Sequence, residues 1–373
     1  MRRVRIGLIS PYSLTIPGGV QNQILALARA LSDSGHRVRV LGPCDGAPPS
    51  TGITPLGNSL PYSVNGSIAP IAPDPACALR TIRALRDEAF DVIHVHEPLV
   101  PGPCQTTLVL KTAPIVGTWH ASGDIGAYSI PGLKWLSARM AIRTAVSADA
   151  EVMARQAIGG NYEVTFNGIE IERFRKAEAM WAGRPTIAYV GRHEPRKGLG
   201  VLLAALQQLP ESLQLWVMSD GPETLELQAQ YSHDQRIRWL GQVTDDEKIE
   251  RLKGADVFCA PSLRGESFGV VLLEAMAART AVVASDIEGY RNVARSGREA
   301  RLVPPNNAAA LADGLREVLS SAEVRQQLVL TGERRAEDFA MDRLAETYVE
   351  IYQRAIALER PSTLLRRRAQ QLI

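Results

Sequence analysis

The sequence predicts an α/β protein with two doubly wound, Rossmann-like domains. Short apolar strands alternate with helical patterns, which is typical of βαβ units around parallel sheets. The alternation restarts after about residue 170, and a length of 373 residues leaves room for two domains. With 45% hydrophobic and 22% charged residues, the composition is that of an ordinary globular protein and excludes disorder or a fibre.

The first half begins with an apolar strand that leads into an amphipathic helix. The elements predicted there are strands at 5–10, 37–41, 91–96 and 115–118 and helices at 20–34 and 76–88. Gly35 supplies the left-handed residue that commonly follows a helix. Residues 42–75 are rich in Pro and Gly and are predicted to form a long loop, a kind of segment that is usually functional or mobile.

The second half repeats the pattern. Its predicted elements are strands at 186–191, 213–218, 237–240, 257–260 and 281–284 and helices at 198–209 and 307–319. A last helix at 342–357 is expected to pack back on either half. We therefore expect domains at 1–168 and 169–341, facing each other across a cleft, with a C-terminal helix and basic tail at 342–373 that crosses back to the first domain.

Charge and cysteine content restrict the class of protein. The chain has 42 basic and 40 acidic side chains, a net charge of +2 that does not predict a nucleic-acid partner. Its four cysteines form no CxxC pair, which favours free buried thiols in a reducing compartment. We expect no signal peptide, and the sequence contains no uninterrupted run of 18 apolar residues. We expect a cytoplasmic protein that can touch the inner face of a membrane.

A glycine pair stands where the first strand turns into the first helix, in Pro17-Gly18-Gly19-Val20. Glycines let a backbone approach a ligand closely, and a helix N-terminus offers unpaired amides to an anion. The segment is not GxGxxG, and no acidic residue stands where a nicotinamide ribose needs one. Two interpretations remain open, a phosphate contact and a simple tight turn.

The corresponding turn of the second half is rich in cations. It reads Gly191-Arg192-His193-Glu194-Pro195-Arg196-Lys197-Gly198. An arginine fork can bind two phosphate oxygens, while lysine acts as a point charge. A diphosphate site is one interpretation, and a solvated charged loop is the other.

The segment from Gly265 to Glu274 is the most informative motif. It follows the strand at 257–260 and opens a helix, with Glu266 before the helix and Glu274 inside it. Since a helix rises about 1.5 Å per residue, these carboxylates are too far apart to act on one bond. They are predicted to bind separate hydroxyl groups of one extended ligand.

Three histidines lie at the ends of strands in the first half. His120 follows the strand at 115–118 and is either structural or part of the cleft. His94 and His96, with Glu97, invite a metal interpretation. However, alternate residues of a strand share a face that is buried in a doubly wound sheet, and no third ligand is evident. We therefore predict no metal site.

The helix at 76–88 carries Arg80, Arg83 and Arg86 within about 120° of arc. Leu79, Ile82 and Leu85 occupy the adjacent face. The pattern fits an ordinary amphipathic surface helix, and it also fits docking on anionic lipid head groups.

Together these motifs resemble the GT-B glycosyltransferases of family 4, and most closely the phosphatidylinositol α-mannosyltransferases of actinobacteria. The resemblance covers nearly the whole chain. It is carried by Pro11-Tyr12-Ser13, Pro17–Gln21, Asn65-Gly66-Ser67, His94–Pro98, Phe166–Ile169, Gly191-Arg192, Pro195–Gly198, Ala255–Pro261, Gly265–Gly269 and Glu274–Ala277. The last two form the Glu-x7-Glu motif of that family.

The resemblance implies a role for each matching position. Arg192 and Lys197 would hold the donor diphosphate, with Gly19 close behind it. The transferred sugar would bind Glu266 and the backbone of Ser267, Phe268, Gly269 and Val270, and the ribose would bind Glu274. His120 matches a histidine beside the sugar and the β-phosphate, so that His120 and Glu266 are the predicted catalytic residues. The predicted acceptor-binding residues are Tyr12, Gln21 and Asn65.

The implied reaction is transfer of mannose from GDP-mannose to phosphatidylinositol with retention of configuration. No cofactor or metal is implied, because Arg192, Lys197 and helix N-termini can neutralise the leaving diphosphate. The chain departs from the family at Pro70 and Ile125, which stand where cations are expected to hold the lipid phosphate. The alternatives are therefore another lipid or a soluble polyol as acceptor and, in a different class, a GT-B-fold sugar-nucleotide epimerase.

Overall fold

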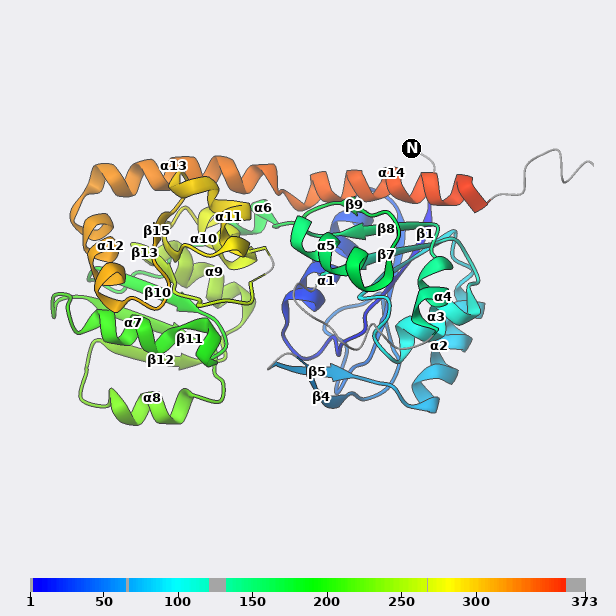
Figure 1. Cartoon of the computed structure of the whole chain (residues 1–373), viewed down its shortest axis with the longest axis horizontal. Helices are drawn as coiled ribbons and strands as arrows, with labels where there is room; N and C mark the ends of the chain where they lie inside the picture. Colours follow the sequence, from blue (N-terminus) through cyan, green and yellow to red (C-terminus); the bar gives the residue numbers. More distant parts are fainter. Residues whose placement is uncertain (1–2, 65–66, 121–131, 267, 360–373) are drawn as a thin grey trace, which may run out of the picture. The chain divides into compact units, whose positions relative to one another are not determined.

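The structure is a computed structural model that describes residues 3–64, 67–120, 132–266 and 268–359. It divides into two compact units (Figure 1). Unit 1 comprises Met1–Gly168 together with Met341–Ile373, and unit 2 comprises Ile169–Ala340. Each unit is a parallel sheet with helices on both faces, so the predicted fold class is confirmed.

Unit 1 contains a seven-stranded parallel sheet in the order β3-β2-β1-β6-β7-β8-β9. The strands are β1 (Arg5–Ile9), β2 (Arg37–Gly42), β3 (Ile53–Pro55), β6 (Val92–His96), β7 (Ile115–Trp119), β8 (Ile142–Ala145) and β9 (Glu163–Val164). Its helices are α1 (Gly19–Asp33), α2 (Pro75–Glu88), α3 (Pro103–Leu110), α4 (Leu133–Ala138), α5 (Ala148–Ile158) and α14 (Met341–Glu359). Chain order reverses between β1 and β6, and ligands of such sheets bind at this reversal, beyond the carboxyl ends of the strands.

The prediction of one long loop over residues 42–75 is wrong. The segment contains the edge strand β3 and an antiparallel hairpin of β4 (Leu60–Val64) and β5 (Ser67–Ile71). Pro61 and Pro70 face each other in this hairpin. Proline lacks an amide donor and is usually confined to edges, so two prolines hid the strand pattern in the sequence.

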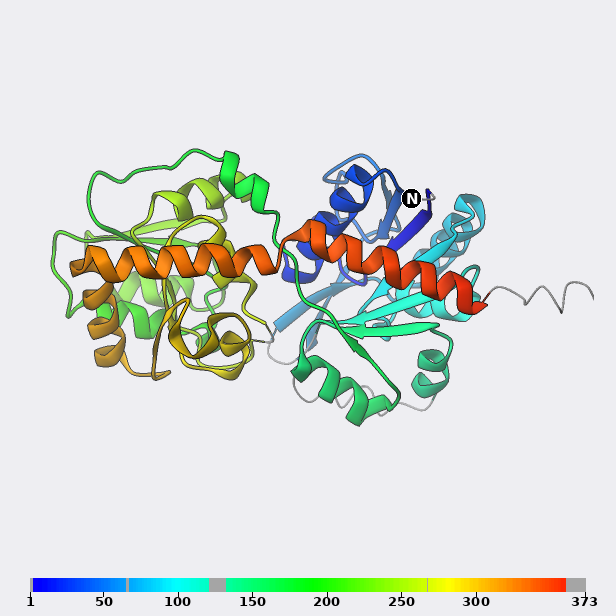
Figure 2. The same cartoon turned by 90° about the horizontal axis from the view of Figure 1, so that it is seen from above.

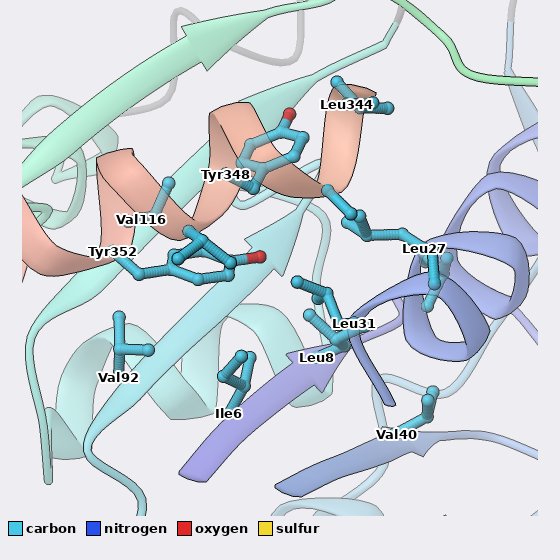
Figure 3. Close-up of a cluster of buried hydrophobic side chains, with 14 of the residues drawn as sticks. Ile6, Leu8, Leu27, Leu31, Val40, Val92, Val116, Leu344, Tyr348 and Tyr352 are labelled. Atoms are coloured by element: carbon cyan, nitrogen blue, oxygen red, sulfur yellow. The ribbon is translucent and has the colours of Figure 1, made fainter. Parts of the chain in front are cut away.

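Helix α14 is part of unit 1, where it lies across the strands of the sheet (Figure 2). Tyr348 and Tyr352 reach from it over β6 and β7 and pack with Val92 and Val116 (Figure 3). This helix therefore completes the core of unit 1 from a sequence distance of more than 170 residues.

Unit 2 contains a six-stranded parallel sheet in the order β12-β11-β10-β13-β14-β15, which repeats the strand order of unit 1. The strands are β10 (Thr186–Val190), β11 (Gln214–Met218), β12 (Ile237–Gly241), β13 (Val257–Ala260), β14 (Ala281–Ser285) and β15 (Arg301–Val303). The helices are α6 (Ile171–Lys176), α7 (Leu199–Leu206), α8 (Thr224–Gln230), α9 (Asp245–Gly254), α10 (Val270–Ala277), α11 (Glu288–Ala294), α12 (Ala308–Ser320) and α13 (Ala322–Asp338). Its switch point lies between β10 and β13.

Helix α13 was not predicted. Only Leu328, Gly332 and Ala336 of its 17 residues are buried, so the apolar stripe that identifies an amphipathic helix is almost absent.

The cysteine prediction is confirmed, since Cys44, Cys77, Cys104 and Cys259 are all buried and free. Within the described ranges, no helix is both long enough and apolar enough to cross a bilayer.

Candidate active site

Gly198 joins the two loops that form the switch point of unit 2. It has φ +69°, and a Cβ at this position would lie 2.1 Å from the carbonyl oxygen of Pro261, in the loop that follows β13. Beside it the amide of Leu263 donates to the carbonyl of Arg196 over 2.7 Å. The cationic turn and the segment before α10, far apart in sequence, therefore form one surface.

The predicted sugar-binding carboxylate, Glu266, is held in place on this surface. The Lys197 Nζ lies 2.5 Å from Glu266 Oε1, and the Ser262 hydroxyl donates to the same oxygen over 2.9 Å. The hydroxyl of Tyr290 in turn donates to Ser262 over 2.8 Å. The structure thus brings Lys197 and Glu266 together and fixes the carboxylate through a second layer of hydroxyl groups.

A residue that sequence reasoning missed, Glu194, organises the arginines of the turn. Its side chain is buried, with Oε1 3.2 Å from Arg192 Nη1 and Oε2 2.9 Å from Arg196 Nε. Arg196 also donates to the carbonyl of Gly265 over 3.2 Å. The signal was an acidic residue between the two arginines of the motif. A buried carboxylate fixes the direction of both guanidinium groups.

Glu274 lies on α10 and has a different lysine partner. The Lys248 Nζ, on α9, lies 2.7 Å from Glu274 Oε1. Burial alone would lower the pKa of Lys248, but the Glu274 and Asp245 carboxylates outweigh it, and the pKa is raised. Each predicted ligand-binding carboxylate of unit 2 therefore has its own ammonium group, and Lys248 is a further residue that the sequence analysis did not single out.

The remaining predicted donor contacts lie at the start of α10. Gly269, at φ +89°, is the N-cap of this helix, and Val270 is its first residue. The Phe268 side chain is only 5% exposed and packs edge-on against Phe339, so only its backbone is available to a ligand. Ser267 lies outside the described residues.

In unit 1, Gly19 begins α1 at the switch point between β1 and β6. No described residue lies within 4 Å of the Cβ that a side chain would place there, and no described side chain caps the helix. The N-terminus of this 15-residue helix therefore has no side-chain cap among the described residues, as an anion site requires.

The predicted acceptor residues have structural partners. The buried Gln21 side chain donates from Nε2 to the carbonyls of Ser13 (3.3 Å) and Ile16 (3.1 Å), and so braces the loop that precedes α1. Tyr12 bridges to Ile71 of β5 through its backbone and is half-buried. Burial, together with the nearby Glu97, raises the pKa of Tyr12, so its hydroxyl stays protonated. Asn65 lies outside the described residues.

His120 follows β7 and is 8% exposed. Its Nε2 lies 2.9 Å from His96 Nδ1, and its backbone amide donates to Glu97 Oε1 over 2.7 Å. Burial lowers the pKa of His120 to about 4. The imidazole is therefore neutral near pH 7.

His94 uses both ring nitrogens within the core. Its Nδ1 lies 2.7 Å from the Tyr352 hydroxyl, and its Nε2 lies 2.6 Å from Thr118 Oγ1. Among the described residues, no three His, Cys, Asp or Glu side chains are grouped so that they could hold a metal ion.

The arginines of α2 are exposed. Arg80 donates to the carbonyl of Leu56 over 3.3 Å, and Arg83 lies 3.6 Å from Asp87. The sequence analysis placed Leu79 on the apolar face, but it is 68% exposed, because Cys77, Thr81, Ala84 and Leu85 form the buried face. An exposed leucine thus stands among the cations of this helix.

Comparison with known proteins identifies the family. Residues 170–335 match the family described as Glycosyl transferases group 1, and residues 17–173 match Glycosyltransferase Family 4. A phosphatidyl-myo-inositol mannosyltransferase of Mycobacterium leprae is 37% identical over 94% of this chain and 96% of its own length. This chain is a member of glycosyltransferase family 4. A protein of the same description from Mycolicibacterium smegmatis is 36% identical to this glycosyltransferase over 94% of both chains.

Solved structures show the same fold at lower identity. A sucrose-phosphate synthase from Thermosynechococcus elongatus matches with a TM-score of 0.74 at 20% identity, over 95% of this glycosyltransferase and 100% of that chain. A glycosyltransferase from Rickettsia africae matches with a TM-score of 0.73 at 18% identity, over 97% and 100%. These similarities confirm the GT-B fold that the sequence predicted.

Proposed function

We propose that this glycosyltransferase transfers mannose from GDP-mannose to phosphatidylinositol, with retention of configuration and without a metal ion. The observation that carries the proposal is the similarity, at 36–37% identity over 94% of the chain, to relatives described as phosphatidyl-myo-inositol mannosyltransferases. Their length matches that of this chain, so both units take part in the comparison.

The geometry of unit 2 supports a nucleotide-sugar donor. Lys197 contacts Glu266, Arg192 belongs to the same turn as Lys197, and Glu274 lies in α10, the helix that follows Glu266. In the proposed complex the two cations bind the diphosphate, Glu266 accepts hydrogen bonds from the sugar, and Glu274 accepts them from the ribose. The lysine ammonium groups that face these carboxylates in the free protein orient them for hydroxyl groups.

The hairpin of unit 1 favours one second candidate, a family-4 enzyme with an acceptor that lacks the lipid phosphate. Pro70 stands where a cation is expected, and its carbonyl accepts a hydrogen bond from the amide of Ser13 over 2.9 Å. The position therefore stabilises the loop around Tyr12 and offers no charge to a phosphate. Ile125, the second position of this kind, lies outside the described residues.

The test is a transfer assay with GDP-mannose and UDP-glucose as donors and three acceptors, namely phosphatidylinositol vesicles, phosphatidylglycerol vesicles and free inositol. We expect mannosyl transfer to phosphatidylinositol alone. Transfer to free inositol at an equal rate would select the second candidate. Transfer from UDP-glucose alone would refute the donor assignment.

A separate prediction concerns metal ions. Because side-chain cations are proposed to neutralise the leaving diphosphate, treatment with EDTA is expected to leave the initial rate of transfer nearly unchanged. The rate is measured before and after chelation, with an added Mg²⁺ arm as control. A rate that EDTA abolishes and Mg²⁺ restores would contradict the metal-free mechanism.

Because the proposed acceptor is a membrane lipid, we also predict that α2 binds an anionic membrane surface. Cations near such a surface contribute about 1 kcal/mol each, and an exposed apolar side chain such as Leu79 can enter the interface. Changing Arg80, Arg83 and Arg86 together to Ser is expected to weaken binding to phosphatidylinositol vesicles by up to roughly 3 kcal/mol at low salt. Exposed charges are screened within about 10 Å at 0.1 M salt, so the difference should shrink as salt rises.

A matched control removes the same charge from unit 2, by changing the exposed Arg238, Arg298 and Arg334 to Ser. Sedimentation with vesicles measures binding, and GDP binding is measured alongside it. If both triple variants bind vesicles as the unchanged protein does, α2 does not dock on the membrane.

A further inference from the structure

The imidazole of His120 has an unusual neighbour, a second buried histidine. His96 Nδ1 lies 2.9 Å from His120 Nε2, and the two rings stack with centroids 5.2 Å apart. His96 is 2% exposed, and its other nitrogen, Nε2, has no hydrogen-bond partner among the described residues. This asymmetry determines which nitrogen of each ring carries the proton.

Both rings are neutral, because burial lowers the pKa of His96 well below its usual value and that of His120 to about 4. Each ring then has one N–H donor and one acceptor nitrogen. If His120 donated from Nε2, the His96 proton would have to sit on Nε2, as a buried donor without an acceptor. If His96 donates from Nδ1, its Nε2 is only a buried lone pair. A buried N–H without an acceptor is rarer than a buried lone pair without a donor, and it costs more free energy.

We propose that His96 is a positioning residue that donates from Nδ1 to His120 Nε2 and so holds His120 as the Nδ1–H tautomer. His120 then has a single free function, which is to donate a hydrogen bond from Nδ1. Its acceptor nitrogen is already engaged, so His120 does not act as a general base.

The surroundings of His96 keep this arrangement in place. The ring of His94 lies against that of His96, with centroids 4.1 Å apart and the planes tilted by 31°. The His94 ring is itself fixed at both nitrogens, by Thr118 and by Tyr352 of α14. The placement of Tyr348 and Tyr352 over β6 and β7 in Figure 3 shows how α14 closes this face of the sheet. Within the described chain, the His96 ring therefore contacts His120 through Nδ1 and has no hydrogen-bond partner at Nε2.

This inference rests on the proposed function in one respect, namely that His120 touches the donor sugar or its phosphate. A neutral donor there stabilises negative charge as it develops on the leaving group without adding a buried charge to the apo protein. The assignment of the tautomer itself does not depend on any substrate.

The first test is an NMR measurement on the ¹⁵N-histidine-labelled full-length protein, because nitrogen shifts distinguish the two tautomers. We expect the His120 signals to show a protonated Nδ1 and an unprotonated Nε2. The opposite pattern would overturn the proposal with no variant needed, whatever the enzyme transfers.

The second test uses a pair of variants. In His96→Asn the amide NH₂ can take the place of Nδ1–H, whereas His96→Phe keeps the ring and removes the donor. We expect His96→Asn to keep the tautomer and to change kcat by less than about threefold, and His96→Phe to mix the tautomers and lower kcat about tenfold with KM for the donor nearly unchanged. Melting curves show whether each variant is folded.

The outcomes separate the two hypotheses. An unchanged His120 tautomer in a folded His96→Phe protein would overturn the positioning role. If His96→Phe mixes the tautomers of His120 but leaves kcat unchanged, His120 does not serve the reaction. That result would refute the role proposed for His120 and would leave the positioning role of His96 intact. Equal losses of kcat in both variants would refute positioning through the Nδ1 donor.

Discussion

Replacing Arg192 with alanine is expected to lower the rate of glycosyl transfer by a factor of about 10²–10³, while the protein stays folded. The guanidinium lies at the switch point of unit 2, where the charge of a departing diphosphate would develop. In the free protein Arg192 is held at 3.2 Å by the buried Glu194 and is otherwise half-exposed, so its loss removes little packing. The measurement is the initial rate of transfer from GDP-mannose under saturating acceptor.

The matched control for this prediction is Arg238→Ala, which removes an exposed arginine from β12 of the same unit. It should retain the full rate. A second variant, Glu194→Gln, keeps Arg192 but neutralises the carboxylate that orients it, and should produce a smaller loss. Turnover near the normal rate in a folded Arg192→Ala protein would remove Arg192 from the diphosphate site.

Replacing Gly198 with alanine is expected to destabilise unit 2 by about 2–4 kcal/mol. The residue has φ +69°, and the added Cβ would meet the Pro261 carbonyl oxygen at 2.1 Å. Backbone cannot move aside as a flexible side chain can, so the loop after β10 must separate from the loop after β13. Chemical denaturation followed by fluorescence measures the loss, and transfer should fall with it because Lys197 is displaced from Glu266.

The expected loss of stability in Gly198→Ala has two causes, the positive φ and the contact with the Pro261 carbonyl. The variant Gly183→Ala separates them. Gly183 has a similar φ of +74°, but no described atom lies within 4 Å of its Cβ position. Only the conformational cost of about 1 kcal/mol is expected there. Equal stabilities of the Gly198→Ala and Gly183→Ala proteins would mean that the close approach to Pro261 does not restrict residue 198.

The backbone of this protein was largely predictable, because strands and helices leave periodic patterns in their own residues. The buried strands β6 and β13 and the helices α1 and α2 appear where the sequence places them, within one or two residues. The glycine pair before α1 was recognisable because backbone freedom is a property of a single residue. Two of the elements that the sequence analysis did not predict have local causes, namely prolines that hid the β4–β5 hairpin and an α13 with few buried side chains.

The partners of the functional side chains were decided by the tertiary structure alone. The pairing of His96 with His120 depends on β6 and β7 being neighbours in the sheet, and the fixing of His94 depends on α14, more than 240 residues away in sequence. The ion pairs of Glu266 with Lys197 and of Glu274 with Lys248 likewise join separate βα units. A residue's own periodicity determines its strand or helix, whereas its hydrogen-bond partner depends on strand order and helix packing. The chemistry could therefore be assigned to residue types from the sequence, but the protonation and orientation of those residues could not.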